Sequence, residues 1–163
     1  MTDRHEVTRT IPADPTTIFA VLCDPQGHVS IDSSGMLMSA SGKPAGAVGD
    51  TFDIKMHREA LNDFPLGAYE VTIRITEFVP DAEIAWTVLS PIADPPIGHV
   101  YGYSLRSVDG GTAVTSYCDW SAIDPIWRDR EIPGIGTVTW PVVPVTALRA
   151  TLGILERTVT RAG

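Results

Sequence analysis

One stretch of this chain, residues 98–121, limits the possible folds more than any other. Apolar and aromatic residues alternate with small or polar ones in its two halves, 98–105 and 114–121, and this period of two is typical of half-buried β-strands. Between the halves, Asp109-Gly110-Gly111 supplies residues that accept the positive φ angles of a short hairpin. The stretch is therefore predicted to form an antiparallel hairpin with aromatic side chains on one face.

The same alternation predicts strands elsewhere in the chain. It is clearest over residues 68–79, where Tyr69, Val71 and Ile73 share one face and polar residues share the other. Shorter strands are expected at residues 4–11, 36–40, 51–58 and 84–89. With the two strands of the hairpin, these are the strands that the pattern predicts.

Helical signals lie near both ends of the chain. Asp14 is a favourable N-cap and Pro15 suits the first helical position, so a helix is predicted to start there, to stop at Pro25, and to be followed by a short second helix near 28–32. A long amphipathic helix is predicted over 145–160 from an apolar stripe at spacings of three and four residues: Val145, Leu148, Leu152, Leu155 and Val159. Gly153 interrupts it, and we expect this glycine to mark the close approach of another element.

Composition and net charge argue against two classes of binding partner. The 163 residues carry a net charge of −8, from 12 basic and 20 acidic side chains, and an acidic surface repels nucleic-acid phosphates and anionic membranes. The length suits one domain, residues 1–163. Two distant cysteines and the lack of an apolar leader or span at the N-terminus predict a cytoplasmic protein without membrane insertion.

Neither a metal nor a cofactor is expected. The chain has no glycine-rich nucleotide-binding motif and no Gly-x-Ser-x-Gly motif. The potential metal ligands lack the local spacing of a metal site: His28, His57, His99 and Cys118.

Three sequence blocks resemble one known family: Pro-Ala-Asp-Pro-Thr-Thr-Ile-Phe-Ala-Val-Leu at 12–22, Ala85-Trp86 after a Pro-Asp turn, and Asp-Gly-Gly-Thr at 109–112. With the order of elements, they resemble the START-like, Bet v 1-like (SRPBCC) superfamily, and within it the polyketide cyclase/dehydrase-type proteins. The resemblance implies an α+β helix-grip fold: a seven-stranded curved antiparallel sheet around a long C-terminal helix, with two short helices after the first strand. It also implies a deep hydrophobic cavity. The chain departs from the family at Ile31, where many relatives carry tryptophan, and in its proline-rich lead into the last helix.

The candidate ligand-binding residues come from the inner face of the predicted sheet, the hairpin and the last helix. Their functional interpretation is a pocket lining, and the alternative is ordinary core packing. Residues 122–144, with 61–67 and 91–98, would form the rim. The candidates are Phe52, Ile54, Met56, Arg58, Tyr69, Val71, Ile73, Trp86, His99, Tyr101, Tyr103, Trp120, Trp140, Leu148, Leu152 and Leu155.

Four polar residues are candidates for chemistry. His99 is a potential acid or base on a cavity wall. Arg58 could hold a carboxylate or an enolate oxygen, or instead pair at the surface with Glu59 or Asp63. A proton acceptor is conceivable at Asp32 or Asp119, although aspartate beside serine and glycine more commonly stabilises a turn.

The sequence thus predicts binding of a small hydrophobic or aromatic metabolite, lipid- or polyketide-like, by a monomer or homodimer. One alternative is a polyketide cyclase/dehydratase-like enzyme that folds its substrate and uses one general acid or base. A third interpretation is an interaction module, which would show an exposed apolar patch and a filled core.

Overall fold

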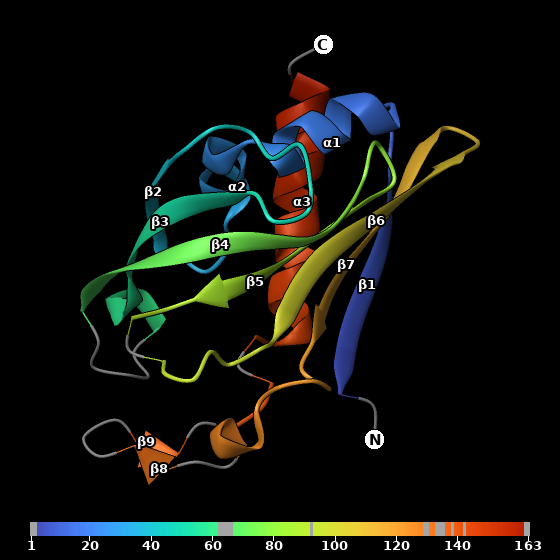
Figure 1. Ribbon diagram of the computed structural model, residues 1–163. Helices are drawn as coiled ribbons and strands as arrows, with labels where there is room; N and C mark the ends of the chain where they lie inside the picture. Colours follow the sequence, from blue (N-terminus) through green and yellow to red (C-terminus); the bar gives the residue numbers. More distant parts are fainter. Residues whose placement is uncertain are drawn as a thin grey trace.

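The computed structural model describes residues 3–61, 67–91, 93–128, 131–132, 136–137, 139–141 and 143–161. A long helix lies across one face of a curved sheet, and two short helices lie at one end of it (Figure 1). The strands of the sheet are β1 (Arg4–Ile11), β2 (Leu37–Ser41), β3 (Thr51–His57), β4 (Ala68–Val79), β5 (Glu83–Leu89), β6 (Val100–Val108) and β7 (Gly111–Asp119). The helices are α1 (Pro15–Cys23), α2 (Pro25–Ile31) and α3 (Val145–Arg161).

All seven strands pair antiparallel, in the order β1-β7-β6-β5-β4-β3-β2. Together with α3 across the sheet and two helices after β1, this order confirms the predicted α+β helix-grip fold. The hairpin closes with Val108 opposite Gly111, and its positive φ angles belong to Gly110 (86°) and Gly111 (148°). A β-carbon at Gly111 would lie 2.0 Å from the carbonyl oxygen of Ile11, so this position also lacks room for a side chain.

The two short helices share one aspartate as their junction. Asp14 caps α1 by accepting a 2.8 Å hydrogen bond from the Thr17 amide, as its sequence predicts. Asp24 then ends α1 and caps α2, accepting a 3.0 Å hydrogen bond from the Gln26 amide. The first helix ends before Pro25, as predicted, but the predicted start of the second helix at residue 28 is wrong, because Pro25 occupies the first position of α2. The second helix consequently begins three residues earlier than predicted.

The core lies between α3, the helices α1 and α2, and the inner face of the sheet. Leu152 and Leu155 of α3 are fully buried, and Leu148 and Val159 are buried beside them, as the apolar stripe predicts. Ile18 and Leu22 of α1 are also fully buried in this core. The long helix therefore holds the sheet in its curved shape through one continuous apolar stripe.

Residues 122–144 were predicted as a long loop. The described part of them holds a short 3-10 helix, η2 (Pro125–Trp127), and a small hairpin of β8 (Glu131–Ile132) and β9 (Gly136–Thr137). Arg128 fastens this segment to the start of the chain: its Nη2 donates to the Asp3 carboxylate at 2.9 Å and to the Trp120 carbonyl at 3.0 Å. The segment lies at the end of the molecule near the N-terminus (Figure 1). Of the other predicted rim loops, residues 62–66 and residue 92 lie outside the described residues.

Gly153 does not mark a close contact, contrary to the prediction. A β-carbon built there has no neighbour within 4 Å. We expect Gly153→Ala to raise the free energy of unfolding by about 0.5–1 kcal/mol, because alanine loses less conformational freedom than glycine in a helix. Urea unfolding of the variant measures this gain.

Gly27→Ala is the matched control in a second helix. Its β-carbon would lie 1.9 Å from the Val21 carbonyl oxygen, so this variant should lose stability. A loss of stability in Gly153→Ala as well would show that α3 packs differently around this position.

Candidate functional site

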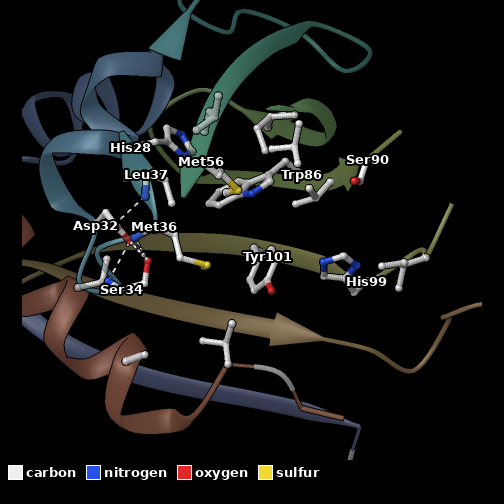
Figure 2. Close-up of a pocket in the computed structure, with 18 of the residues that line it drawn as sticks. His28, Asp32, Ser34, Met36, Leu37, Met56, Trp86, Ser90, His99 and Tyr101 are labelled. Carbon is white, nitrogen blue, oxygen red and sulfur yellow. Dashed lines mark hydrogen bonds between the residues drawn. The ribbon is translucent and has the colours of Figure 1, made fainter. Parts of the chain in front are cut away.

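A cavity of about 520 Å³ lies between the inner face of the sheet, α2 and the first turns of α3. This volume falls in the range of roughly 300–1,000 Å³ that is usual for small-molecule sites. Strands β3 to β7 contribute Ile54, Val71, Val88 and Tyr103, among others, and α3 contributes Leu148. The wall is therefore mostly apolar, with a few polar groups at defined places (Figure 2).

Aromatic rings form one continuous side of the cavity. The indole of Trp86 lies near the centre, tilted by 31° to the rings of Tyr101 and Tyr103 at centroid distances of 6.2 and 5.8 Å. The strand register explains this grouping, because Trp86 pairs with Tyr101 and the next inward residue of β6 is Tyr103. The chain of rings continues to His28 on one side of Trp86 and to His99 beyond Tyr101 on the other (Figure 2).

His28 comes from α2 and is buried in the cavity wall. Its Nε2–H donates to the Leu22 carbonyl at 2.8 Å, because a carbonyl oxygen can only accept. The ring also makes edge-on contacts with Phe52 and Trp86 at centroid distances of 5.1 and 4.7 Å. Burial lowers the pKa of His28 to about 4, so the imidazole is neutral at pH 7.

His99 precedes β6 near the mouth of the cavity and is 6% exposed. Its ring lies 5.1 Å from Trp140 and 5.2 Å from Tyr101, and its buried Nδ1 has no hydrogen-bond partner among the described residues. Burial lowers the pKa of His99 to about 4, since the charged imidazolium would lose its hydration there. An unpaired polar atom in such a place costs stability and calls for an explanation.

The two inner tyrosines, Tyr101 and Tyr103, are buried in the wall opposite Cys118 and Ser116 of β7 in the strand register. Burial raises the pKa of both phenols above its usual range, so both remain protonated at pH 7. Both residues therefore present uncharged aromatic side chains to the cavity.

Asp32 lines the cavity, yet its carboxylate serves the turn between α2 and β2. It accepts hydrogen bonds from the Ser34 amide (3.0 Å) and hydroxyl (2.6 Å) and from the amides of Gly35 (2.9 Å) and Leu37 (3.3 Å), some of which are visible in Figure 2. This is the turn-stabilising use of aspartate that the sequence left open. The geometry gives Asp32 a structural role in place of proton transfer.

Arg58 and Asp119, the other polar candidates, have different surroundings. Arg58 is half-buried in the cavity wall, with Nη1 3.7 Å from the sulfur of Met36. Glu59, one of its two possible surface partners, is exposed beside His57, and Asp63 lies outside the described residues. Asp119 is outside the cavity: it accepts from Arg4 and from Ser121, and these hydrogen bonds lower its pKa.

The mouth is built from two loops that hold each other. The Asp124 amide donates to the Ile97 carbonyl at 2.9 Å, and the Trp127 indole N–H donates to the Pro95 carbonyl at 2.8 Å. The Trp140 indole N–H donates to the Trp127 carbonyl at 3.2 Å, which places Trp140 beside His99. The tryptophans of the proline-rich segment therefore close part of the rim.

Most of the predicted ligand-binding residues lie in the cavity wall. Those found there are Ile54, Met56, Arg58, Tyr69, Val71, Ile73, Trp86, His99, Tyr101, Tyr103, Trp140 and Leu148. Whether they contact a ligand stays a prediction.

Four of the predicted residues lie elsewhere. Phe52 is covered by the ring of His28, and Leu152 and Leu155 are packed in the core, because only the first turns of α3 reach the cavity. Trp120 follows the end of β7 and packs in a separate cluster with Cys118 and Ile123, its ring against His5.

Several wall residues were not predicted. His28 and Ile31 lie three residues apart in α2 and so share a helix face, which is a signal that the sequence contained. Ser116 lies opposite Tyr103 in the hairpin register and could have been found from it. The mouth residues Ile97, Trp127 and Val143 lie in the loops that were predicted to form the rim, although they carry no periodic signal and are placed by loop contacts.

The described part of the chain holds neither a cluster of metal ligands nor a candidate membrane-spanning helix. Among those residues, no three histidine, cysteine, aspartate or glutamate side chains gather in a way that could hold a metal ion. No helix there is long and apolar enough to cross a membrane. The cytoplasmic location and the single domain stay predictions.

Solved structures share this architecture. Protein CV1439 from Chromobacterium violaceum has a TM-score of 0.66 at 16% identity, with 98% of each chain covered. The AHSA1-like protein from Aeromonas hydrophila has a TM-score of 0.61 at 14% identity, with 98% of this chain and 94% of that chain covered. The fold is AHSA1-like. Aha1 from Colwellia psychrerythraea, solved as a dimer, has the same AHSA1-like fold, with a TM-score of 0.52, 18% identity, and coverage of 96% of this chain and 92% of that chain.

Sequence comparison adds one curated relative. The uncharacterized protein Rv0088 of Mycobacterium tuberculosis is 28% identical over 118 residues, which are 71% of this chain and 47% of that protein. The chain thus spans about half the length of the curated relative it matches. No family model matches the chain. At these identities, the AHSA1-like likeness establishes the fold and leaves the ligand to be argued from the cavity.

Proposed function

We propose that the protein binds a small hydrophobic or aromatic molecule, lipid- or polyketide-like, inside the cavity. The observation that supports this most is an apolar, aromatic cavity of about 520 Å³ within an otherwise well-packed core. A void of this size would be costly if it served only packing, because its lining forfeits van der Waals contacts. A bound apolar molecule restores those contacts.

A dye-binding measurement tests the proposal. Titration with 1-anilinonaphthalene-8-sulfonate should give enhanced fluorescence, and Met56→Trp, which fills the cavity from β3, should weaken binding by at least about tenfold. The matched control is Met38→Trp, because Met38 is 53% exposed on β2 and does not line the cavity. Equal affinity of the Met56→Trp variant and the wild type would place the dye outside the cavity and contradict the proposal.

One specific observation supports the alternative that the protein is an enzyme. His99 lies in the apolar wall, where burial shifts its pKa, and a shifted pKa in a cavity is one mark of a catalytic group. However, an imidazole with a pKa of about 4 is a weak base at pH 7, and catalytic bases work best with a pKa near the working pH. This argument favours binding over catalysis.

A carbon-acid assay separates the two functions. An enzyme would speed the loss of α-deuterium from 2-tetralone, with the imidazole taking the deuteron and the enolate regaining a proton from water. A binding protein would leave the exchange rate at its value in buffer.

The oligomeric state, monomer or homodimer, is a separate proposal that native mass spectrometry resolves.

A further inference from the structure

The cavity wall ends in an imidazole on each side of its aromatic centre. His28 contacts Trp86 at one end, and His99 contacts Tyr101 at the other, so the two imidazoles flank the stacked rings (Figure 2). Both are buried, at 7% and 6% exposure. Among the described residues, the other titratable and charged side chains that line the cavity are Asp32, Arg58, Tyr69, Asp94, Tyr101, Tyr103 and Tyr117.

The hydrogen bonding of His28 fixes what a ligand can offer it. Its Nε2 carries the proton that is donated to Leu22, so its Nδ1 keeps a lone pair and can only accept. No hydrogen bond of the described residues reaches this Nδ1. A ligand group beside it must therefore be a donor, such as a hydroxyl or an N–H.

His99 requires a polar partner for a different reason. Its buried Nδ1 has no hydrogen-bond partner among the described residues, and the ring as a whole is almost wholly buried. A neutral imidazole has one donor and one acceptor nitrogen, so a hydroxyl on the ligand can satisfy whichever nitrogen faces it after a ring flip. A saturated hydrocarbon chain would leave both imidazoles unsatisfied.

We infer that His28 and His99 select a flat aromatic ligand that carries hydroxyl or N–H donors at its ends, in preference to a fatty acyl chain. This inference rests on the proposed function and names its ligand class. The rings of Trp86, Tyr101 and Tyr103 supply a surface on which a planar molecule stacks. The imidazoles then form hydrogen bonds with the polar groups at its ends. A ligand that lacks such groups is rejected, because it leaves the buried imidazoles unpaired.

The test compares 2-naphthol with 2-methylnaphthalene, which has nearly the same shape and lacks the donor. The ratio of their dissociation constants, measured by tryptophan fluorescence, should favour 2-naphthol about tenfold more in the wild type than in His28→Phe or His99→Phe. His57→Phe is the control, because His57 ends β3 and does not line the cavity. Its ratio should equal that of the wild type.

A measurement on the wild-type protein covers the case that a variant fails to fold. The nitrogen-15 resonance of His28 Nδ1 should shift when 2-naphthol binds and stay in place with 2-methylnaphthalene. Binding of both naphthalenes with unchanged ratios and no shift would overturn this inference while leaving cavity binding intact. Tighter binding of dodecanoate than of 2-naphthol would also overturn it. If Met56→Trp bound the dye as tightly as the wild type, that result would instead contradict the proposed function itself.

Discussion

Lowering the pH from 7 to 4 is expected to reduce the free energy of unfolding by several kcal/mol through His28 and His99. In the folded protein, burial lowers the pKa of each from 6.5 to about 4. The unfolded chain therefore binds more protons than the folded one between these values, and stability is lost as the pH falls through this window. Each pKa unit corresponds to roughly 1.4 kcal/mol, so each histidine contributes about 3 kcal/mol. Above pH 6.5, both contributions are fully present.

Urea unfolding at pH 7, 5.5 and 4 measures this effect. His99→Phe should remove about half of the extra loss at pH 4, because phenylalanine cannot be protonated and suits the rings around it. His57→Phe is the control, since His57 lies partly exposed at the end of β3. An unchanged pH dependence in the variant lacking both His28 and His99 would show that other groups control acid unfolding.

Leu152→Ala is expected to cost about 2–5 kcal/mol of stability, near the upper part of that range. Leu152 is fully buried in the middle of α3, within the main core and away from the cavity. Truncation there leaves a new void that its tightly packed neighbours cannot fill. Leu148→Ala should cost less, because Leu148 already borders the cavity and its removal only enlarges an existing space.

Chemical denaturation of both variants decides this point. The comparison uses the same substitution on the same stripe of α3, so helix propensity cancels. A loss under about 0.5 kcal/mol for Leu152→Ala would contradict its position in the core. A larger loss for Leu148→Ala than for Leu152→Ala would show that the cavity is filled by packing.

The strands and long helix were predictable because their signals are local. Alternation gave β4 its bounds of 68–79, and the stripe from Val145 gave α3 nearly its full length. The same alternation grouped Met56, Tyr69, Trp86 and Tyr101, since neighbouring strands bring them to one inner face. A period of two therefore predicts the sheet and a large part of the cavity wall together.

The remaining features depend on contacts between distant segments. The stripe that contains Leu148 also contains Leu152, and only tertiary packing decides that the first reaches the cavity. Trp120 was predicted to line the pocket with the hairpin, but β7 ends at Asp119 and the tryptophan ring packs against His5. His28 lies in the wall because Asp24 caps a second helix that starts at Pro25, three residues before its predicted start.

The link between Arg128 and Asp3 has a practical consequence for work with this protein. It ties the rim segment to the third residue of the chain, and the Trp120 amide donates to the Asp3 carbonyl at 2.8 Å as well. An affinity tag fused at the N-terminus would thus be attached close to the residues that anchor the segment carrying Trp127 of the cavity wall. The two termini lie at opposite ends of the molecule (Figure 1), so purification handles and surface-immobilisation chemistry belong at the C-terminal end.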